Sequence, residues 1–262
     1  MPTSALHVAR TGLDAQDTRM RVIANNLANV GTTGFKRDRA NFATLAYQDA
    51  RVAGQQSSTE TAYATGLNLG TGVSVQSTTR IDTAGALQTT DNPLDLALDG
   101  DGYFQIQLPG GQLGYTRAGN FSRSSDGQLV TAQGYQVVPA IQLPEGASSV
   151  TVSEDGTVSA IVAGQSEPQQ LGQITIASFA NPAGLQAAAD NLLMETAASG
   201  PAQIGVPGEN GRGHIKQGML EGSNVNIVEE LVDMIECQRA FEINSKMISA
   251  VDEMLRNANQ TL

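Results

Sequence analysis

Few residues of this 262-residue sequence have the types and spacing that chemistry requires. Asp99 to Gly102 reads Asp-Gly-Asp-Gly, and carboxylates on a tight loop can bind calcium, but the ligand spacing of a calcium loop and its later bidentate glutamate are missing. His7 and His214 lie far apart without an acidic or cysteine cluster, which supports neither a zinc site nor a Ser-His-Asp triad. Residues 208–213 are rich in glycine but lack the Gly-Lys-Ser/Thr ending of a phosphate-binding loop. We therefore expect a protein that has no catalytic residue, cofactor or metal and is not an enzyme.

Composition narrows the class further. The single cysteine, Cys237, excludes an intrachain disulfide, and we expect a packed thiol instead of a reactive one. The net charge of −11 and the absence of a Lys/Arg cluster argue against a nucleic-acid partner. The N-terminus lacks the basic start, apolar run and cleavage site of a secretory signal, so we expect any export to use a route without a cleaved signal.

Two rows of apolar side chains, one near each end of the chain, indicate the elements that position these residues. Spacings of three and four in the first row predict a helix with one apolar face, and the breaker cluster at 31–34 predicts its end. Spacings of seven in the second row predict a helix from about Ile227 to Asn259. The first row comprises Leu6, Ala9, Leu13, Gln16, Met20, Ile23, Leu27 and Val30. The second comprises Ile227, Met234, Phe241, Ile248 and Leu255, with Leu231, Ile235, Val251 and Ala258 beside it.

We expect these two helix seams to form contacts between subunits. Residues 1–40 contain six basic and three acidic side chains, net +3, whereas residues 226–262 contain three basic and seven acidic ones, net −4. Opposite charge favours pairing of the two ends, within one chain or between neighbours. An ordinary two-helix core packed on the β region is the alternative, but no short partner covers either row. The seam residues are Leu6, Leu13, Met20, Ile23, Leu27, Val30, Ile227, Leu231, Met234, Phe241, Ile248 and Leu255.

The residues between the helices divide into a polar part and a β part. Residues 41–71 are small and polar without a sustained period, which favours an unstructured linker in the isolated monomer, with docking after assembly as the alternative. Alternating apolar residues from 73 to about 176 predict an antiparallel meander or small barrel of roughly six to ten short strands. We interpret 99–102 as a plain turn, and 126–127 and 155–156 (both Asp-Gly) as hairpin turns.

The motifs at the two helix ends resemble the signatures of the bacterial flagellar rod and hook subunits. Ala24 to Lys36 reads ANNLANVGTTGFK, and the stretch from Glu221 to Ile248 begins EGSNVNIVEELVDMI and continues through QRAFEINSKMI. Further similarity runs through DNPLDLALDGDGYFQI, GYTRAGNF, DGQLVTAQGY and EDGTVS, so the resemblance covers nearly the whole chain. The matching motif residues are Asn25, Asn26, Leu27, Asn29, Thr33, Gly34, Phe35, Asn224 and Asn226.

The resemblance implies an α+β fold in which the N- and C-terminal helices pair as a coiled coil and the central domain is mainly antiparallel β. It implies four parts, namely an N-terminal helix (1–36), an extended segment (37–80), a central β domain (81–220) and a C-terminal helix (221–262). The chain length and the segment 47–73 are similar to those of the subunits that build the distal part of the rod. In those subunits the segment packs between neighbours and helps keep the shaft straight. A proximal rod or hook subunit is the alternative within the family.

The resemblance also implies a helical homopolymer, which would form a rigid tube around the export channel and transmit motor torque to the hook. Its partners would be further copies of the chain, the proximal rod subunits, the hook protein, the ring proteins of the peptidoglycan and outer membrane, and the flagellar type III export apparatus. It would lie in the basal body, from the periplasm to the outer membrane. A periplasmic enzyme acting on the cell wall is the alternative from another class, but no carboxylate pair stands in a recognisable catalytic motif.

Overall fold

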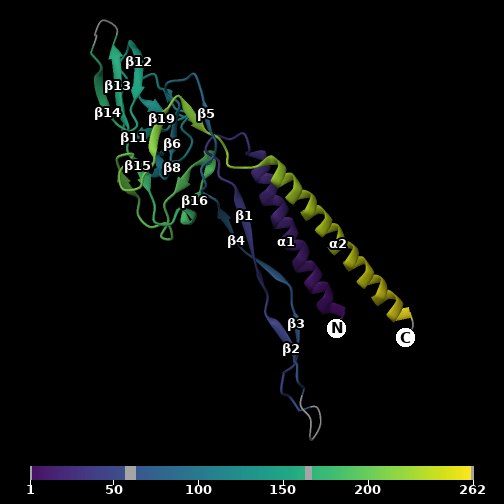
Figure 1. Cartoon of the computed structure of the whole chain (residues 1–262). Helices are drawn as coiled ribbons and strands as arrows, with labels where there is room; N and C mark the ends of the chain where they lie inside the picture. Colours follow the sequence, from purple (N-terminus) through teal and green to yellow (C-terminus); the bar gives the residue numbers. More distant parts are fainter. Residues whose placement is uncertain (1, 57–62, 163–166, 261–262) are drawn as a thin grey trace. The chain divides into compact units, whose positions relative to one another are not determined.

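A computed structural model describes residues 2–56, 63–162 and 167–260 of the protein (Figure 1). The chain folds into two compact units. The helical unit consists of Met1–Leu27, Asp38–Thr79 and Asn226–Leu262, and the β unit consists of Ala28–Arg37 and Arg80–Val225. The chain therefore passes from one unit to the other four times, at 27/28, 37/38, 79/80 and 225/226.

Two long helices occupy the ends of the chain, as predicted. α1 spans Pro2–Ala28 and α2 spans Ile227–Gln260. Asn226 caps α2, because its side-chain oxygen accepts a hydrogen bond from the Val228 backbone N–H at 3.1 Å. Two glutamates then occupy the first turn, where the helix dipole favours negative charge. The expected α+β class is confirmed at this level, with a helix at each end and a mainly antiparallel β body between them.

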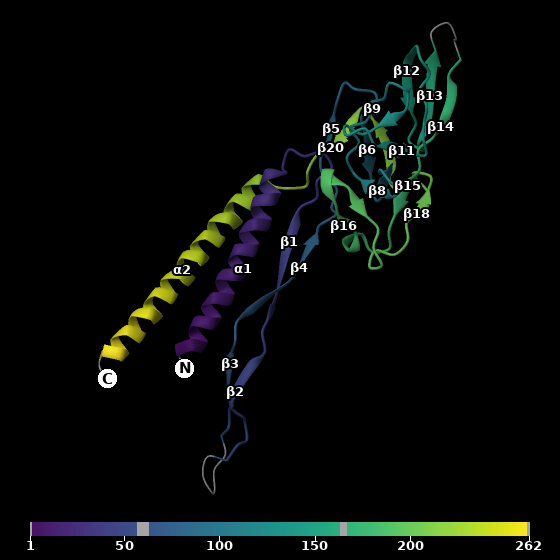
Figure 2. The same ribbon diagram turned by 180° about the vertical axis from the view of Figure 1, so that it is seen from behind.

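Four paired strands lie within residues 38–56 and 63–80, so the expectation of an unstructured linker is wrong for the described part of 41–71. β1 (Asp38–Thr44) pairs with β4 (Val73–Arg80), and β2 (Tyr47–Arg51) pairs antiparallel with β3 (Leu67–Gly70). Both ribbon views show these strands following one another along a hairpin (Figures 1 and 2). In these strands the peptide groups of a polar sequence bond to one another without a hydrophobic core. Such backbone pairing cannot be predicted from side-chain composition. Residues 57–62 lie outside the described residues.

The β unit contains short strands joined by tight turns and two 3₁₀ turns. Its first strands are β5 (Leu87–Thr89), β6 (Leu96–Asp99), β7 (Tyr103–Gln107), β8 (Leu113–Thr116), β9 (Ser122–Arg123), β10 (Leu129–Val130), β11 (Gln136–Val138) and β12 (Ala147–Val152). The remaining strands are β13 (Thr157–Val162), β14 (Gln169–Gln173), β15 (Ile176–Ser178), β16 (Gln186–Ala187), β17 (Leu193–Met194), β18 (Gln203–Gly205), β19 (His214–Gln217) and β20 (Met219–Glu221). The 3₁₀ turns are η1 (Pro182–Gly184) and η2 (Ala189–Asn191).

The largest sheet has the order β16-β17-β8-β7-β11-β10-β9, and β15 joins it by pairing with β7 and β18. Smaller sheets are β12-β13-β14, β19-β6 and β20-β5, and the strands of these sheets pair antiparallel. The predicted hairpins at 126–127 and 155–156 are confirmed, since they join β9 to β10 and β12 to β13. The strands are short, as predicted, but the described residues between 73 and 178 contain twelve of them, β4 to β15, against the six to ten predicted.

The turn at 99–102 does not close a hairpin. β6, before it, pairs with β19, whereas β7, after it, pairs with β8, β11 and β15. Gly100 and Gly102 have φ of 118° and 141°, where a side chain is strained, so the turn moves the chain from one sheet to the next through glycine. The plain-turn interpretation holds, with a sheet crossover in place of a hairpin.

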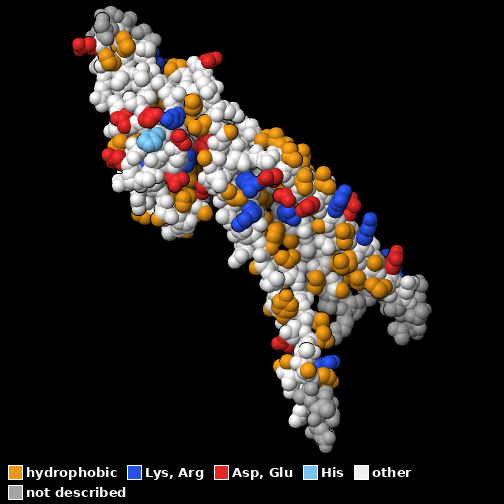
Figure 3. Space-filling view, viewed as in Figure 1, with side chains coloured by type: hydrophobic (Ala, Val, Ile, Leu, Met, Phe, Trp, Pro, Cys, Tyr) orange, Lys and Arg blue, Asp and Glu red, His pale blue; other side chains and the backbone are white. Residues whose placement is uncertain are grey.

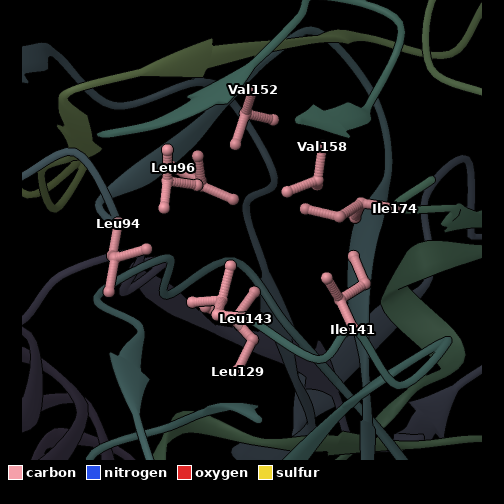
Figure 4. A pocket seen from close by; sticks show the side chains of 9 residues that line it. Leu94, Leu96, Leu129, Ile141, Leu143, Val152, Val158 and Ile174 are labelled. Atoms are coloured by element: carbon pink, nitrogen blue, oxygen red, sulfur yellow. The ribbon is translucent and has the colours of Figure 1, made fainter. Parts of the chain in front are cut away.

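The core of the β unit is aliphatic and aromatic. One cluster is built around Phe104, Phe121 and Ile176, and a second is built around Tyr103, Tyr115 and Phe179. Only aliphatic side chains line a small cavity in the first cluster, where they point toward one another (Figure 4). This cavity offers no group to bind a polar ligand. Among the described helices, none is long and apolar enough to cross a membrane.

Candidate assembly surface and chain junction

Within the helical unit, α1 and α2 lie side by side and run antiparallel (Figures 1 and 2). Arg19 Nη2 lies 2.9 Å from Asp233 Oδ1, in the sense expected from the opposite charges of the two chain ends. The Cys237 thiol donates hydrogen bonds to the backbone and side-chain oxygens of Gln16, at 3.1 and 3.2 Å. Cys237 is 0% exposed, which confirms the packed thiol, and burial raises its pKa.

Besides Asp233, the residues of α2 that meet α1 include members of a second heptad row, which shares only Val251 with the residues named in the row predicted from the sequence. Asn244 lies beside Gly12, where an added Cβ would come within 3.2 Å of the Asn244 amide nitrogen. Cys237 meets Gln16, as described above, and Val251 continues the row and is buried. The members of the row, each seven residues apart, are Glu230, Cys237, Asn244 and Val251. Hydropathy misses this row because most of its members are not aliphatic.

Many apolar side chains of α2 are instead exposed, and we call them the α2 apolar face. Phe241 is 40% exposed and Val228 is 69% exposed. Figure 3 shows hydrophobic side chains gathered over the terminal helices. A helix of this length with many exposed apolar side chains is typical of a protein contact surface. The α2 apolar face comprises Ile227, Val228, Leu231, Val232, Ile235, Phe241, Ile243, Met247 and Met254.

The structure places the predicted seam residues at different depths. Ile23 is buried. Three residues of α2 are exposed, namely Ile227, Leu231 and Phe241. The half-buried ones are Leu6, Leu13, Met20, Leu27, Val30, Met234 and Ile248. The side chain of Leu255 lies outside the described residues. Their role between subunits stays a prediction, because a single chain contains no subunit contact.

Asn26, one of the family-motif residues, joins three elements of the helical unit. Its Nδ2 donates to the Asp38 carbonyl at 2.9 Å and to Glu230 Oε1 at 3.2 Å. Its Oδ1 accepts a hydrogen bond from the Asp38 backbone N–H at 2.9 Å. Asn26 is 2% exposed, so these bonds satisfy an amide that water does not reach. The end of α1 is thereby fixed to the start of β1 and to α2.

In the β unit, a buried charged trio holds together segments that are far apart in the sequence. Glu221 Oε1 accepts hydrogen bonds from Lys36 Nζ at 2.5 Å and from the Gly85 backbone N–H at 2.9 Å. Glu221 Oε2 lies 3.3 Å from Arg117 Nη1. Lys36 Nζ also donates to the Thr83 carbonyl at 2.7 Å. Burial lowers the pKa of Lys36, and its hydrogen bond to Glu221 opposes that shift.

Asn224 and Gly34 complete this arrangement, which we call the chain junction. Asn224 Nδ2 donates to the Ile81 carbonyl at 2.8 Å and to both oxygens of Thr83 at 3.0 and 3.1 Å. Its Oδ1 accepts from the Arg37 backbone N–H at 2.7 Å. Gly34 has φ +66°, and an added Cβ would lie 2.6 Å from the carbonyl carbon of Arg117. The chain junction comprises residues 33–37, 81–86 and 221–224 together with Arg117.

The other motif residues lie beside these two groups. Thr33 accepts a hydrogen bond from Asn191 at its carbonyl, and the Asn29 carbonyl and side chain close the turn after α1 by accepting from Thr32. Phe35 donates its N–H to Thr32 and accepts from the Asn224 N–H. Asn25 is exposed, Leu27 is half-buried, and Asn226 caps α2. Sequence reasoning did not single out Lys36, Arg117 or Glu221, although each lies in a quoted stretch of the resemblance.

These arrangements bind chain segments and offer little reactive chemistry. Among the described residues, no group of His, Cys, Asp and Glu could hold a metal ion. Burial raises the pKa of Tyr103 to about 12, so the phenol stays neutral, although the Arg117 cation, 5.4 Å from its ring centre, opposes that shift. In the described part of the structure, no hydrogen bond links His214 or the turn at 99–102 to a nucleophilic side chain.

Comparison with known proteins finds similarity along nearly the whole chain. Residues 6–36 match the family described as "Flagella basal body rod protein", residues 97–160 match "Flagellar hook protein FlgE/F/G D1 domain", and residues 216–261 match "Flagellar basal body rod FlgEFG protein C-terminal". The flagellar basal-body rod protein FlgG of Buchnera aphidicola from Acyrthosiphon pisum is 49% identical over 256 residues, with 98% of each chain covered. FlgG of Bacillus subtilis is 40% identical, with 96% of each chain covered. The flagellar basal-body rod protein FlgF of Salmonella typhimurium is 35% identical, with 98% of each covered.

Proposed function

This chain belongs to the family of flagellar basal-body rod proteins, and we propose that it is a structural subunit of the distal rod and not an enzyme. The observation that carries the proposal is similarity over nearly the full length to proteins named FlgG, at 49% and 40% identity, against 35% for the FlgF relative. We place the protein in the basal body, from the periplasm to the outer membrane, after export through the flagellar type III apparatus.

The proposed mechanism is mechanical. The α2 apolar face has no cover within the helical unit, and neighbouring copies of the same chain would supply it in a helical homopolymer. In that polymer α1 and α2 would pair as a coiled coil around the export channel, using the seam residues predicted from the sequence. Support comes from the antiparallel contacts of α1 with α2 within one chain, such as Arg19 with Asp233.

The four proposed parts have separate tasks. The terminal helices 1–36 and 221–262 would form the inner wall of the tube, the extended segment 37–80 would dock between subunits and stiffen the shaft, and the β domain 81–220 would lie outside. The tube would transmit torque from the proximal rod subunits to the hook protein, inside the ring proteins of the peptidoglycan and outer membrane. Exposed apolar side chains on the hairpin, including Tyr47, Leu67 and Leu69, support a docking role.

Electron microscopy of basal bodies from a strain that lacks this gene tests the proposal. We expect structures that keep the proximal rod but stop before the distal rod, with normal length restored by the gene supplied in trans. Basal bodies that stop before the proximal rod would assign the chain to the proximal rod, and complete rods without a hook would assign it to the hook. Complete rods and hooks, together with peptidoglycan hydrolysis by the purified protein, would replace the structural role with an enzymatic one.

A further inference from the structure

The chain junction lies where the polypeptide leaves the β unit. The chain passes between the two units at 27/28, 37/38, 79/80 and 225/226, and the junction segments 33–37, 81–86 and 221–224 lie next to three of these crossings. The fourth crossing lies at the other end of the same short segment, 28–37. Any force that the covalent chain carries between the units must therefore pass through residues next to this junction.

Backbone hydrogen bonds join the three segments to one another. The Gly34 N–H donates to the Glu221 carbonyl at 2.7 Å, the Ile81 N–H donates to the Arg37 carbonyl at 2.9 Å, and the Gly222 N–H donates to the Ala86 carbonyl at 2.8 Å. An added Cβ on Gly85 would lie 1.9 Å from the Gly222 carbonyl oxygen, so the segments approach as closely as glycine allows. The segments are thus packed backbone against backbone.

Burial of the charged trio is an inefficient source of stability for the β unit. Glu221 is 0% exposed, and the side chains of Lys36 and Arg117 are 3% and 5% exposed, so three charges are removed from water. Arg117 Nε is also buried with no hydrogen-bond partner in the structure. Apolar residues of similar size commonly match or exceed the stability of such a group. Apolar packing does not fix the position of one segment against another. Each charged hydrogen bond here does, because it ends on a defined atom of another segment.

We propose that Lys36, Arg117 and Glu221 are positioning residues that clamp the chain crossings at one place on the β unit, so that the junction does not open when the rod carries torque. Glu221 contacts all the other parts of the clamp, through Lys36 of the first segment, Gly85 of the second and Arg117 of the β body. The clamp itself is defined within the β unit, and only its purpose under torque rests on the proposed function.

The test compares Lys36→Met/Arg117→Leu/Glu221→Met in the full chain with the control Glu154→Gln/Lys216→Met, which removes an exposed ion pair of the same unit with the same 2.5 Å spacing. Hydrogen exchange is read at the Gly34, Ile81 and Gly222 amides, which bond to carbonyls that the substitutions leave in place. We expect the triple variant to keep its melting temperature within a few degrees, while these amides exchange at least about tenfold faster. The Ile174 amide of the core should not change, and the control should match wild type at every amide.

Swimming speed in media of low and high viscosity gives the second readout. We expect the triple variant to lose speed mainly at high viscosity, where torque is high, and the control to swim normally at both. Unchanged junction amides would overturn the clamp, whatever the motility. Faster junction exchange with normal swimming at high viscosity would overturn its purpose under torque and leave the rod assignment intact. Should the triple variant fail to fold, Glu221→Gln replaces it, and equal acceleration of junction and core amides in that variant would overturn the proposal.

Discussion

Glu221 illustrates how one side chain can organise residues from both ends of a sequence. Its carboxylate accepts from Lys36, 185 positions away, and from the backbone of Gly85. Burial of a carboxylate and an ammonium group is tolerated only when both find partners, and the Thr83 carbonyl supplies a further acceptor to Lys36. The buried interior of the β unit therefore includes residues that flank the two terminal helices.

This dependence predicts a pKa change at Lys36. Burial lowers its pKa and Glu221 raises it, so Glu221→Gln should lower it further. The unfolded chain keeps the proton up to about pH 10.4. Because the unfolded state then binds more protons, the free energy of unfolding of the variant should rise with pH from the lowered pKa to that value. Titration of the Lys36 side-chain carbon signal by NMR checks the direction, and a pKa at or above the wild-type value would contradict it.

Gly34 allows a prediction with a matched control. Gly34 and Gly134 both have positive φ, +66° and +88°, but only Gly34 has backbone atoms in the way of a Cβ, whereas nothing lies within 4 Å at Gly134. Gly134→Ala should cost about 1–2 kcal/mol from backbone strain alone. Gly34→Ala should cost clearly more, because the 2.6 Å contact with Arg117 forces the junction apart. Urea unfolding of both variants measures the difference in free energy of unfolding. Equal decreases would show that the junction accommodates the added methyl group at little cost.

At the scale of elements, α2 carries two heptad rows with different surroundings. The predicted row was found because Ile227, Phe241 and Ile248 are plainly apolar, and periodicity was sufficient to give the helix its limits. In the row that meets α1, Cys237 and Val251 fit the predicted apolar stripe, but Glu230 and Asn244 look like surface residues in a hydropathy pattern and are not predicted. Their burial or close contact depends on Asn26 and Gly12 of the other helix, and this information lies more than 200 positions away.

The α2 apolar face gives a prediction at the scale of one element. Phe241→Asp places a charge on the α2 apolar face, where Phe241 is 40% exposed, so the monomer should lose little stability and keep its melting temperature. Polymerisation and motility should be lost, since a charge buried without a partner in a subunit contact costs several kcal/mol. Ser245→Asp, at an exposed polar position of the same helix, is the control and should swim normally. Normal swimming of the Phe241 variant would remove the α2 apolar face from the proposed subunit contact.

The hairpin formed by β1 to β4 has few side-chain features from which it could be predicted. Its ladder is made of main-chain bonds and small polar contacts, such as Asn41 with Thr79 at 2.6 Å, and β2 has no half-buried side chain to create a period. Deleting Gln55 to Thr65 should leave export intact but change the stiffness or curvature of the rod in electron micrographs. Rods of unchanged straightness would count against the proposed stiffening by segment 37–80.

At the scale of the molecule, the two units differ in how they are stabilised. The β unit encloses apolar clusters such as that around Phe104 and Ile176, whereas the helical unit leaves much of its apolar surface uncovered. The sequence predicted the helices, the β class and two hairpins, because those depend on local period and turn residues. It did not predict the chain junction, because Lys36, Arg117 and Glu221 have no common spacing and meet only after the chain has folded.

Limited trypsin digestion of the purified monomer tests this difference between the units. Local unfolding precedes cleavage, and its free energy is lower where less apolar surface is buried. We therefore expect early cuts at exposed residues of the helical unit, such as Arg51 and Arg239, and late cuts at Lys36 and Arg117, which are buried in the junction. Mass spectrometry of the time course should show two persistent fragments, one that contains 28–37 and one that contains 80–225, which are the two parts of the β unit. Cleavage at Arg117 as early as at Arg51 would mean that the two units open together, and that the helical unit is as firmly folded in the monomer as the β unit.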